Sequence, residues 1–233
     1  MVKGGRLAAI AGLLLLGACT RPVDDPLAVR SIYWGLAPMQ DYEGALPEVL
    51  FSADDAPDKQ GLLYTAMAEA EVAALYAGRA LAAGDAVGVR GALGEVLYAI
   101  DPALAPEWDA KAAGIVAGWA GTGYGLRRAA DGMAAEIRAA VAAGDGAALA
   151  EYGPPAVRCA DNTLGRAEQI VALVDQTQGA PAIQTEQLLR QIEALAVELN
   201  SGAGRATDAD LADPDCGLEQ AERYLDHVAP GRG

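Results

Sequence analysis

Apolar residues recur at three- and four-residue spacing along most of the chain beyond residue 58. In residues 59–83, Leu62, Ala66, Ala70 and Ala73 fall on one face of a helix. The same periodicity predicts further helices at residues 86–100, 108–120, 126–143, 147–152, 159–178, 185–199 and 218–228. We therefore expect an all-α fold: an antiparallel helical bundle of about four main helices plus shorter helices.

Glycine, aspartate and proline mark the expected ends of these helices. Gly84 fits a C-cap and Asp85 fits the N-cap of the next helix. Gly144-Asp145 repeats this signal 60 residues later, which indicates either a duplicated helical hairpin or a chance match in an Ala-rich chain. Gly153-Pro154-Pro155 is expected to end the short helix at 147–152. Caps are also predicted at Asn162 and Thr185.

Acidic residues within the predicted helices are interpreted as surface positions. We expect Glu69, Glu95 and Glu136 to face solvent, as charged side chains on bundle helices usually do. A di-iron bundle would need paired Glu-x-x-His motifs, and the chain contains a single histidine, His227. His227 falls in the last predicted helical turn, where a cation suits the helix dipole.

The segment before the helices is different in character. Residues 20–30 are polar and contain two prolines, which is typical of a spacer, and residues 37–58 look irregular, with one helical turn near 48–51. We predict an N-terminal tether at 19–57 and a helical bundle domain at 58–233.

Charge narrows the range of partners. The chain has 32 acidic and 17 basic residues, a net charge of −15. This excludes a nucleic-acid partner, which needs a basic surface. The acidity serves solubility, or it indicates a cationic partner: a metal, a peptide or a protein.

The first twenty residues carry a targeting pattern. Lys3 and Arg6 precede an apolar run over residues 7–16, which is too short for a finished transmembrane helix. Leu16-Gly17-Ala18-Cys19 follows, and it resembles the lipobox of bacterial lipoproteins. The resemblance implies a signal peptide at 1–18 that is removed, and lipid on Cys19. With Thr20 after the cysteine, it further implies a palmitate-bearing protein of the outer membrane that faces the periplasm.

Two cysteines remain once Cys19 carries lipid. Cys159 and Cys216 form an even pair, and an exported compartment permits a disulfide between them. The alternatives are two free buried thiols or a metal pair, although neighbouring ligands for a metal are missing.

A glycine-rich segment is the first candidate site. Gly121-Thr122-Gly123-Tyr124-Gly125 precedes Arg127 and Arg128 at the start of a predicted helix. Gly123, Gly125, Arg127 and Arg128 could hold an anion with backbone amides and guanidinium groups. The segment follows a helix and lacks the spacing of nucleotide-binding loops, so the alternative is a hinge between two helices.

The acidic loop near residues 200–215 is the second candidate. Asp208, Asp210, Asp213 and Asp215 form a possible weak divalent-cation site, or a solvated acidic loop. The early ligand positions of a calcium loop hold Asn200, Gly202 and Gly204 instead of carboxylates. No firm metal site and no cofactor are therefore expected.

These observations favour a non-enzymatic role. We expect a membrane-tethered periplasmic lipoprotein whose helical body binds another envelope protein. The alternative is a helical bundle that binds a small ligand or a divalent cation. A hydrolase that uses paired carboxylates is the least favoured hypothesis.

Overall fold

The computed structural model describes residues 46–105, 120–203 and 214–229. Within these ranges the secondary structure is helical, which confirms the predicted all-α class. The elements in chain order are α2 (Pro47–Leu50), the short 3-10 helix η1 (Pro57–Lys59), α3 (Leu62–Ala82), α4 (Ala86–Ile100), η2 (Pro102–Leu104), α6 (Leu126–Ala143), α7 (Ala147–Thr177), α8 (Ala182–Ser201) and α9 (Leu218–Asp226).

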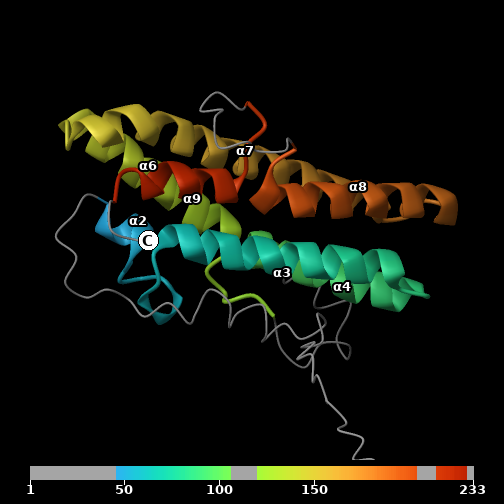
Figure 1. The fold of residues 1–233 in the computed structure, drawn as a ribbon. Coiled ribbons are helices and arrows are strands. Elements are labelled where there is room, and N and C mark those ends of the chain that lie inside the picture. Colours follow the sequence, from blue (N-terminus) through green and yellow to red (C-terminus); the bar gives the residue numbers. More distant parts are fainter. Residues whose placement is uncertain (1–45, 106–119, 204–213, 230–233) are drawn as a thin grey trace, which may run out of the picture.

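Four of these helices close into a bundle. Helix α3 packs against α6 and α8, and α7 packs against the same two helices from the other side. Figure 1 shows α3 and α4 as one hairpin, with α7 and α8 running along it. Helix α4 lies on α3, and α9 (red) lies on α7. The bundle thus consists of α3, α6, α7 and α8. The predicted helix at 108–120 lies outside the described residues, apart from its last residue.

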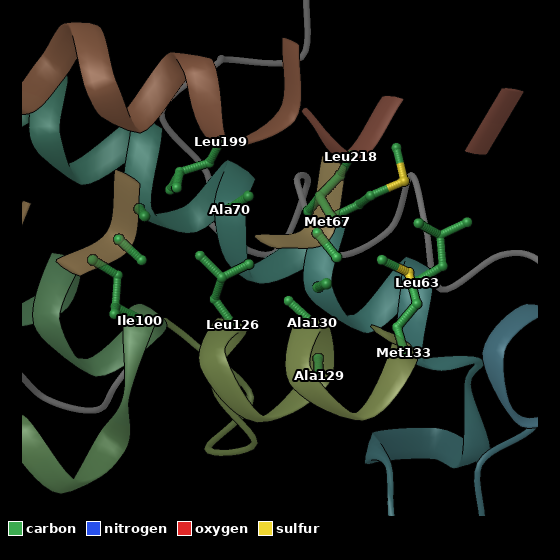
Figure 2. Packing of buried hydrophobic residues seen from close by; sticks show 14 of the residues in the cluster. Leu63, Met67, Ala70, Ile100, Leu126, Ala129, Ala130, Met133, Leu199 and Leu218 are labelled. Carbon is green, nitrogen blue, oxygen red and sulfur yellow. The ribbon is translucent and has the colours of Figure 1, made fainter. Parts of the chain in front are cut away.

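The core is built from alanine with a few larger side chains. Leu63 and Met67 of α3 face Leu126 and Met133 of α6 (Figure 2), and all four are buried. Fully buried alanines separate them on both helices: Ala66, Ala70, Ala73, Ala77, Ala129, Ala130 and Ala134. Small side chains let two helix backbones approach closely, which explains how a chain with a single phenylalanine fills its interior.

Among the predicted glycine and aspartate caps, Asp85 and Gly144 are confirmed and Gly84 is wrong. The carboxylate of Asp85 accepts hydrogen bonds from the amides of Val87 and Gly88, so it caps α4 as expected. Gly144 ends α6 in the left-handed conformation, with φ at 80°. Gly84 does not adopt this conformation: the C-cap residue of α3 is Ala83, with φ at −68°, and Gly84 is not one of the described glycines with positive φ. The two Gly-Asp turns of the 60-residue echo therefore have different backbones.

The predicted break at Gly153-Pro154-Pro155 is wrong. Helix α7 runs through both prolines as one helix of 31 residues. A Cβ on Gly153 would lie 2.7 Å from Cγ2 of Val141, so the glycine lets α7 and α6 touch at this point. Pro155 and Ala156 are also buried against the bundle. Tertiary packing thus offsets the backbone hydrogen bonds that two prolines remove.

Asn162 and Thr185 lie inside helices and do not cap them, so these two predictions are wrong. Asn162, on α7, donates from Nδ2 to the carbonyl of Pro214 at 2.7 Å. Thr185, on α8, donates from Oγ1 to the carbonyl of Pro181 at 3.2 Å. Both side chains donate hydrogen bonds to backbone carbonyls outside their own helices. The sequence alone does not distinguish such a residue from a helix cap.

The packed body begins earlier than the predicted boundary at residue 58. Leu46, Val49 and Leu50 belong to the hydrophobic core, and α2 packs against α3 and α6. Pro47 occupies the first turn of α2, where its missing amide costs no hydrogen bond. Prolines in residues 37–58 suggested a tether, although Val49, Leu50 and Ala53 are buried between Pro47 and Pro57.

The predicted disulfide is confirmed. Cys159 of α7 is bonded to Cys216 in the segment before α9, across 57 residues of sequence. Arg166, which is buried on α7, donates to the carbonyls of Cys216 at 2.9 Å and Asp215 at 2.7 Å. The bridge and these hydrogen bonds hold the C-terminal segment against α7.

Within the described ranges, none of the helices combines the length and the apolar character that a membrane crossing requires.

Candidate functional site

Two glutamates predicted to face solvent are instead buried in the bundle. Glu69 of α3 and Glu95 of α4 are each 1% exposed, which corrects the surface interpretation, whereas Glu136 is exposed as expected. The burial of Glu69 could have been inferred from its spacing along α3. Glu69 follows the buried Ala66 by three residues and precedes the buried Ala73 by four, which places it on the same face. A buried carboxylate is tolerated only where donors meet it.

The donors come from the segment that precedes α6. The backbone amide of Thr122 donates to Oε1 of Glu69 at 2.7 Å, and the hydroxyl of Thr122 donates to the same oxygen. The amide of Ala120 donates to Oε2 of Glu95 at 2.9 Å. A Cβ on Gly121 would lie 2.8 Å from Oε2 of Glu69, so glycine is needed between the two contacts. We call this arrangement the carboxylate clasp: Glu69 and Glu95 with residues 120–122.

The clasp fixes the backbone that leads to a surface cavity. Gly123 and Gly125 adopt φ values of 83° and 87°, which favour glycine, and they turn the chain into α6. A Cβ on Gly125 would lie 2.7 Å from Cδ of Pro102. The turn therefore packs directly on η2. The cavity between them has a volume of about 270 Å³ and is lined by Ile100, Asp101, Pro102, Ala103, Gly123, Tyr124, Arg127 and Arg128.

Both arginines of the cavity are held by carboxylates at its edge. Nη2 of Arg128 donates to Asp55 at 2.7 Å, and its guanidinium carbon lies 4.3 Å from the centre of the Tyr124 ring. Arg127 lies between Asp101 at 3.7 Å and Glu168 at 3.8 Å. These last two distances are ion pairs longer than hydrogen bonds. The Arg127 guanidinium thus retains donors that it does not use on those carboxylates.

Tyr124 connects the cavity to Asp55. Its hydroxyl donates to the Asp55 carboxylate at 3.2 Å, and the side chain is largely buried. Burial raises the pKa of Tyr124 above its ordinary value of 10.0, and the negative charge of Asp55 raises the pKa further. Arg128 acts in the opposite direction. The hydroxyl therefore remains a neutral donor throughout the physiological range.

The structure brings together most of the predicted anion site. Gly123, Arg127 and Arg128 line one cavity, and Gly125 forms the turn beside it. The prediction missed the opposite wall at 100–103, which follows α4 and lies more than twenty residues earlier in the chain. Asp101-Pro102 directly follows the predicted helix at 86–100, and its contact with the glycine-rich turn is a tertiary feature that this pattern does not contain.

A second cavity of about 330 Å³ lies between α2 and α6. Val49, Ala139, Ala140 and Ala143 give it an apolar floor, and three carboxylates contribute to its lining: Glu48, Glu136 and Asp145. This is the acidic counterpart of the arginine-lined cavity, on the other end of α6.

The predicted cation site is only partly described. Asp208, Asp210 and Asp213 lie outside the described residues, as does the lipidation residue Cys19. Asp215 is exposed, and its backbone carbonyl accepts hydrogen bonds from Arg166 and Ala203. Among the residues that the structure describes, no three Asp, Glu, His or Cys side chains gather in a way that could hold a metal ion.

His227 serves as the C-terminal cap residue of α9, and its ring stacks on Tyr152 with 4.5 Å between the ring centres. The imidazole is thus used in packing the end of α9 on α7.

Comparison of the chain with protein-family models, with curated proteins and with solved structures finds no match.

Proposed function

We propose that the protein is a lipid-anchored, non-enzymatic helical module that binds another component of the bacterial cell envelope. The observation that carries this proposal is the Cys159–Cys216 disulfide. Disulfides form and persist in exported compartments, and the lipobox-like Leu16-Gly17-Ala18-Cys19 predicts the same destination from the other end of the chain. In this account, acylated Cys19 holds the helical body at the outer membrane, where it faces the periplasm.

The charge of the chain supports a cationic partner surface. A net charge of −15 repels other acidic proteins and anionic headgroups, and it attracts basic surfaces. Negative charge and apolar surface lie together in the cavity between α2 and α6. Its lining contains the carboxylates of Glu48, Glu136 and Asp145 beside apolar side chains. The partner we expect is an envelope protein that presents basic side chains around an apolar contact.

Crosslinking of the full-length protein in intact cells, followed by its purification from envelope extracts, tests this proposal. We expect one envelope protein to be recovered with the wild-type chain and to be lost when Glu48, Glu136 and Asp145 are changed to their amides. Equal recovery with an unrelated acidic lipoprotein would contradict the proposal, and so would an unchanged yield from the triple variant.

The buried carboxylates favour a second candidate, a bundle that binds a divalent cation. Glu69 and Glu95 place two carboxylates in the interior, on the adjacent helices α3 and α4. Thermal melts of the full chain with calcium, iron or zinc test this function, because a ligand that binds only the native state raises the melting temperature. A rise of several degrees that is lost in Glu69→Gln would support it. Superimposable melts with and without each metal would eliminate it.

A further inference from the structure

The lining of the cavity at the start of α6 contains two arginines on an acidic protein. Of its charged lining residues, Arg127 and Arg128 are cationic and Asp101 is anionic, whereas the whole chain carries a net charge of −15. Asp55 and Glu168 approach the two guanidinium groups from outside this lining. Three carboxylates thus surround the two guanidinium groups, and each guanidinium is paired with at least one of them.

Both guanidinium groups are oriented but not saturated. Arg128 stacks over the Tyr124 ring and uses Nη2 on Asp55, and its side chain is 60% exposed. Arg127 is 34% exposed and meets Asp101 and Glu168 only at 3.7 and 3.8 Å. Ion pairs as open to water as Arg128–Asp55 contribute little to stability, so a ligand can compete with Asp55 for the guanidinium. The planar fork of an arginine matches a carboxylate in two parallel hydrogen bonds.

The other lining residues and the volume of the cavity indicate the size and character of the rest of the ligand. Pro102 and Ala103 contribute apolar surface to the lining, and Tyr124 belongs to the same lining. The volume of about 270 Å³ is below the range of drug-sized pockets. This space suits a small carbon skeleton, which an inorganic ion would leave unfilled.

We propose that this cavity binds a small organic carboxylate, with Arg127 and Arg128 on the carboxylate and Pro102 and Ala103 against its carbon skeleton. The carboxylate clasp helps to position the site, because its hydrogen bonds fix residues 120–122 immediately before the turn at Gly123. The site belongs to the folded body and is independent of the lipid anchor, so its failure would leave the proposed tethering untouched.

Isothermal titration of the full chain, purified in mild detergent, with succinate, benzoate and inorganic phosphate tests this site. Sodium chloride at matched ionic strength serves as the control for screening. We expect saturable binding of at least one carboxylate at one site per chain, and weaker binding of phosphate. Arg127→Gln and Arg128→Gln should each weaken binding at least tenfold, and Arg127→Lys should weaken it less than Arg127→Gln, because it retains the charge and loses the fork.

Arg190→Gln is the matched control, since Arg190 forms a comparable exposed ion pair with Glu186 at 2.7 Å on α8, away from the cavity. It should bind the carboxylate as the wild type does. The proposal is overturned if neither carboxylate binds saturably, if phosphate binds more tightly than both, or if Arg127→Gln binds as well as Arg190→Gln. Circular dichroism and the melting temperature without ligand show whether each variant is folded, and Arg127→Lys decides the outcome if Arg127→Gln is not.

Discussion

Thr122 donates both its backbone amide and its hydroxyl to one oxygen of Glu69, a residue 53 positions earlier in the chain. This relationship joins the middle of α3 to the turn that opens α6. It also explains how a glutamate is accommodated on the inner face of a helix whose other buried residues are mainly apolar. The carboxylate supplies the acceptor that a buried amide needs.

Removal of the Thr122 hydroxyl should weaken the fold. Thr122→Val keeps the shape of the side chain and the backbone contact, but it loses the hydrogen bond that the hydroxyl donates to Glu69 and the one that it accepts from the amide of Tyr124. We therefore expect the free energy of unfolding to fall by about 1.5–3 kcal/mol. Chemical denaturation measures this change. Glu136→Gln, at an exposed position on α6, is the control and should stay within about 0.5 kcal/mol of the wild type. Equal effects of the two substitutions would show that the clasp does not contribute to stability.

Two glycine substitutions should change stability in opposite directions. A Cβ on Gly217 would lie 2.4 Å from the carbonyl oxygen of Asn200, and backbone cannot move aside as a side chain can. Gly217→Ala should therefore cost about 3 kcal/mol. Gly165, within α7, has open space around it, so Gly165→Ala should add about 0.5–1 kcal/mol through helix propensity. The two melting temperatures, measured side by side, check both signs. A neutral Gly217→Ala would mean that this contact is looser than described.

The disulfide should contribute a large part of the stability. Because it joins residues 57 apart, the chain-entropy estimate is about 4 kcal/mol. The double variant Cys159→Ala/Cys216→Ala should lose that amount in chemical denaturation, and the wild type should lose a similar amount under strong reductant. A variant as stable as the wild type would indicate that α9 is held mainly by Arg166 and Asn162.

Tyr124 gives the fold a dependence on alkaline pH. The unfolded chain releases this proton near pH 10, whereas the folded chain keeps it to higher pH because burial and Asp55 raise the pKa. Above pH 10 the folded state therefore binds more protons than the unfolded state, and stability falls as the pH rises. Difference absorbance between wild type and Tyr124→Phe should show tyrosinate appearing above pH 10. Ionisation at or below pH 10 would contradict this assignment.

Sequence periodicity predicted the helical content, because the apolar spacing along α3, α4 and α6 is regular and each ends at a clear signal. The limits of α6 agree with the predicted range of 126–143. The disulfide was also predictable, since the expected lipidation of Cys19 leaves two cysteines. In these helices and in the disulfide, the local sequence pattern and the tertiary packing favour the same structure.

The errors arise where a tertiary contact overrides a local rule. Pro154 and Pro155 normally end a helix, but the close contact of Gly153 with Val141 keeps α7 intact. Glu69 and Glu95 are charged, but amides from a distant segment satisfy them. The opposite wall of the arginine-lined cavity could not be predicted either, because no pattern in a single sequence states that Pro102 meets Gly125.

Incorporation of radiolabelled palmitate into the wild type and into Cys19→Ser tests the central claim most directly. The account predicts that label enters the wild type, that Cys19→Ser takes up none, and that the unlabelled variant is released from the membrane fraction. Two or three buried acyl chains give stable anchoring, so the wild type should stay with the membrane through a high-salt wash. A wild type that takes up no palmitate, together with a Cys19→Ser form that is processed normally and fractionates in the same way, would contradict it.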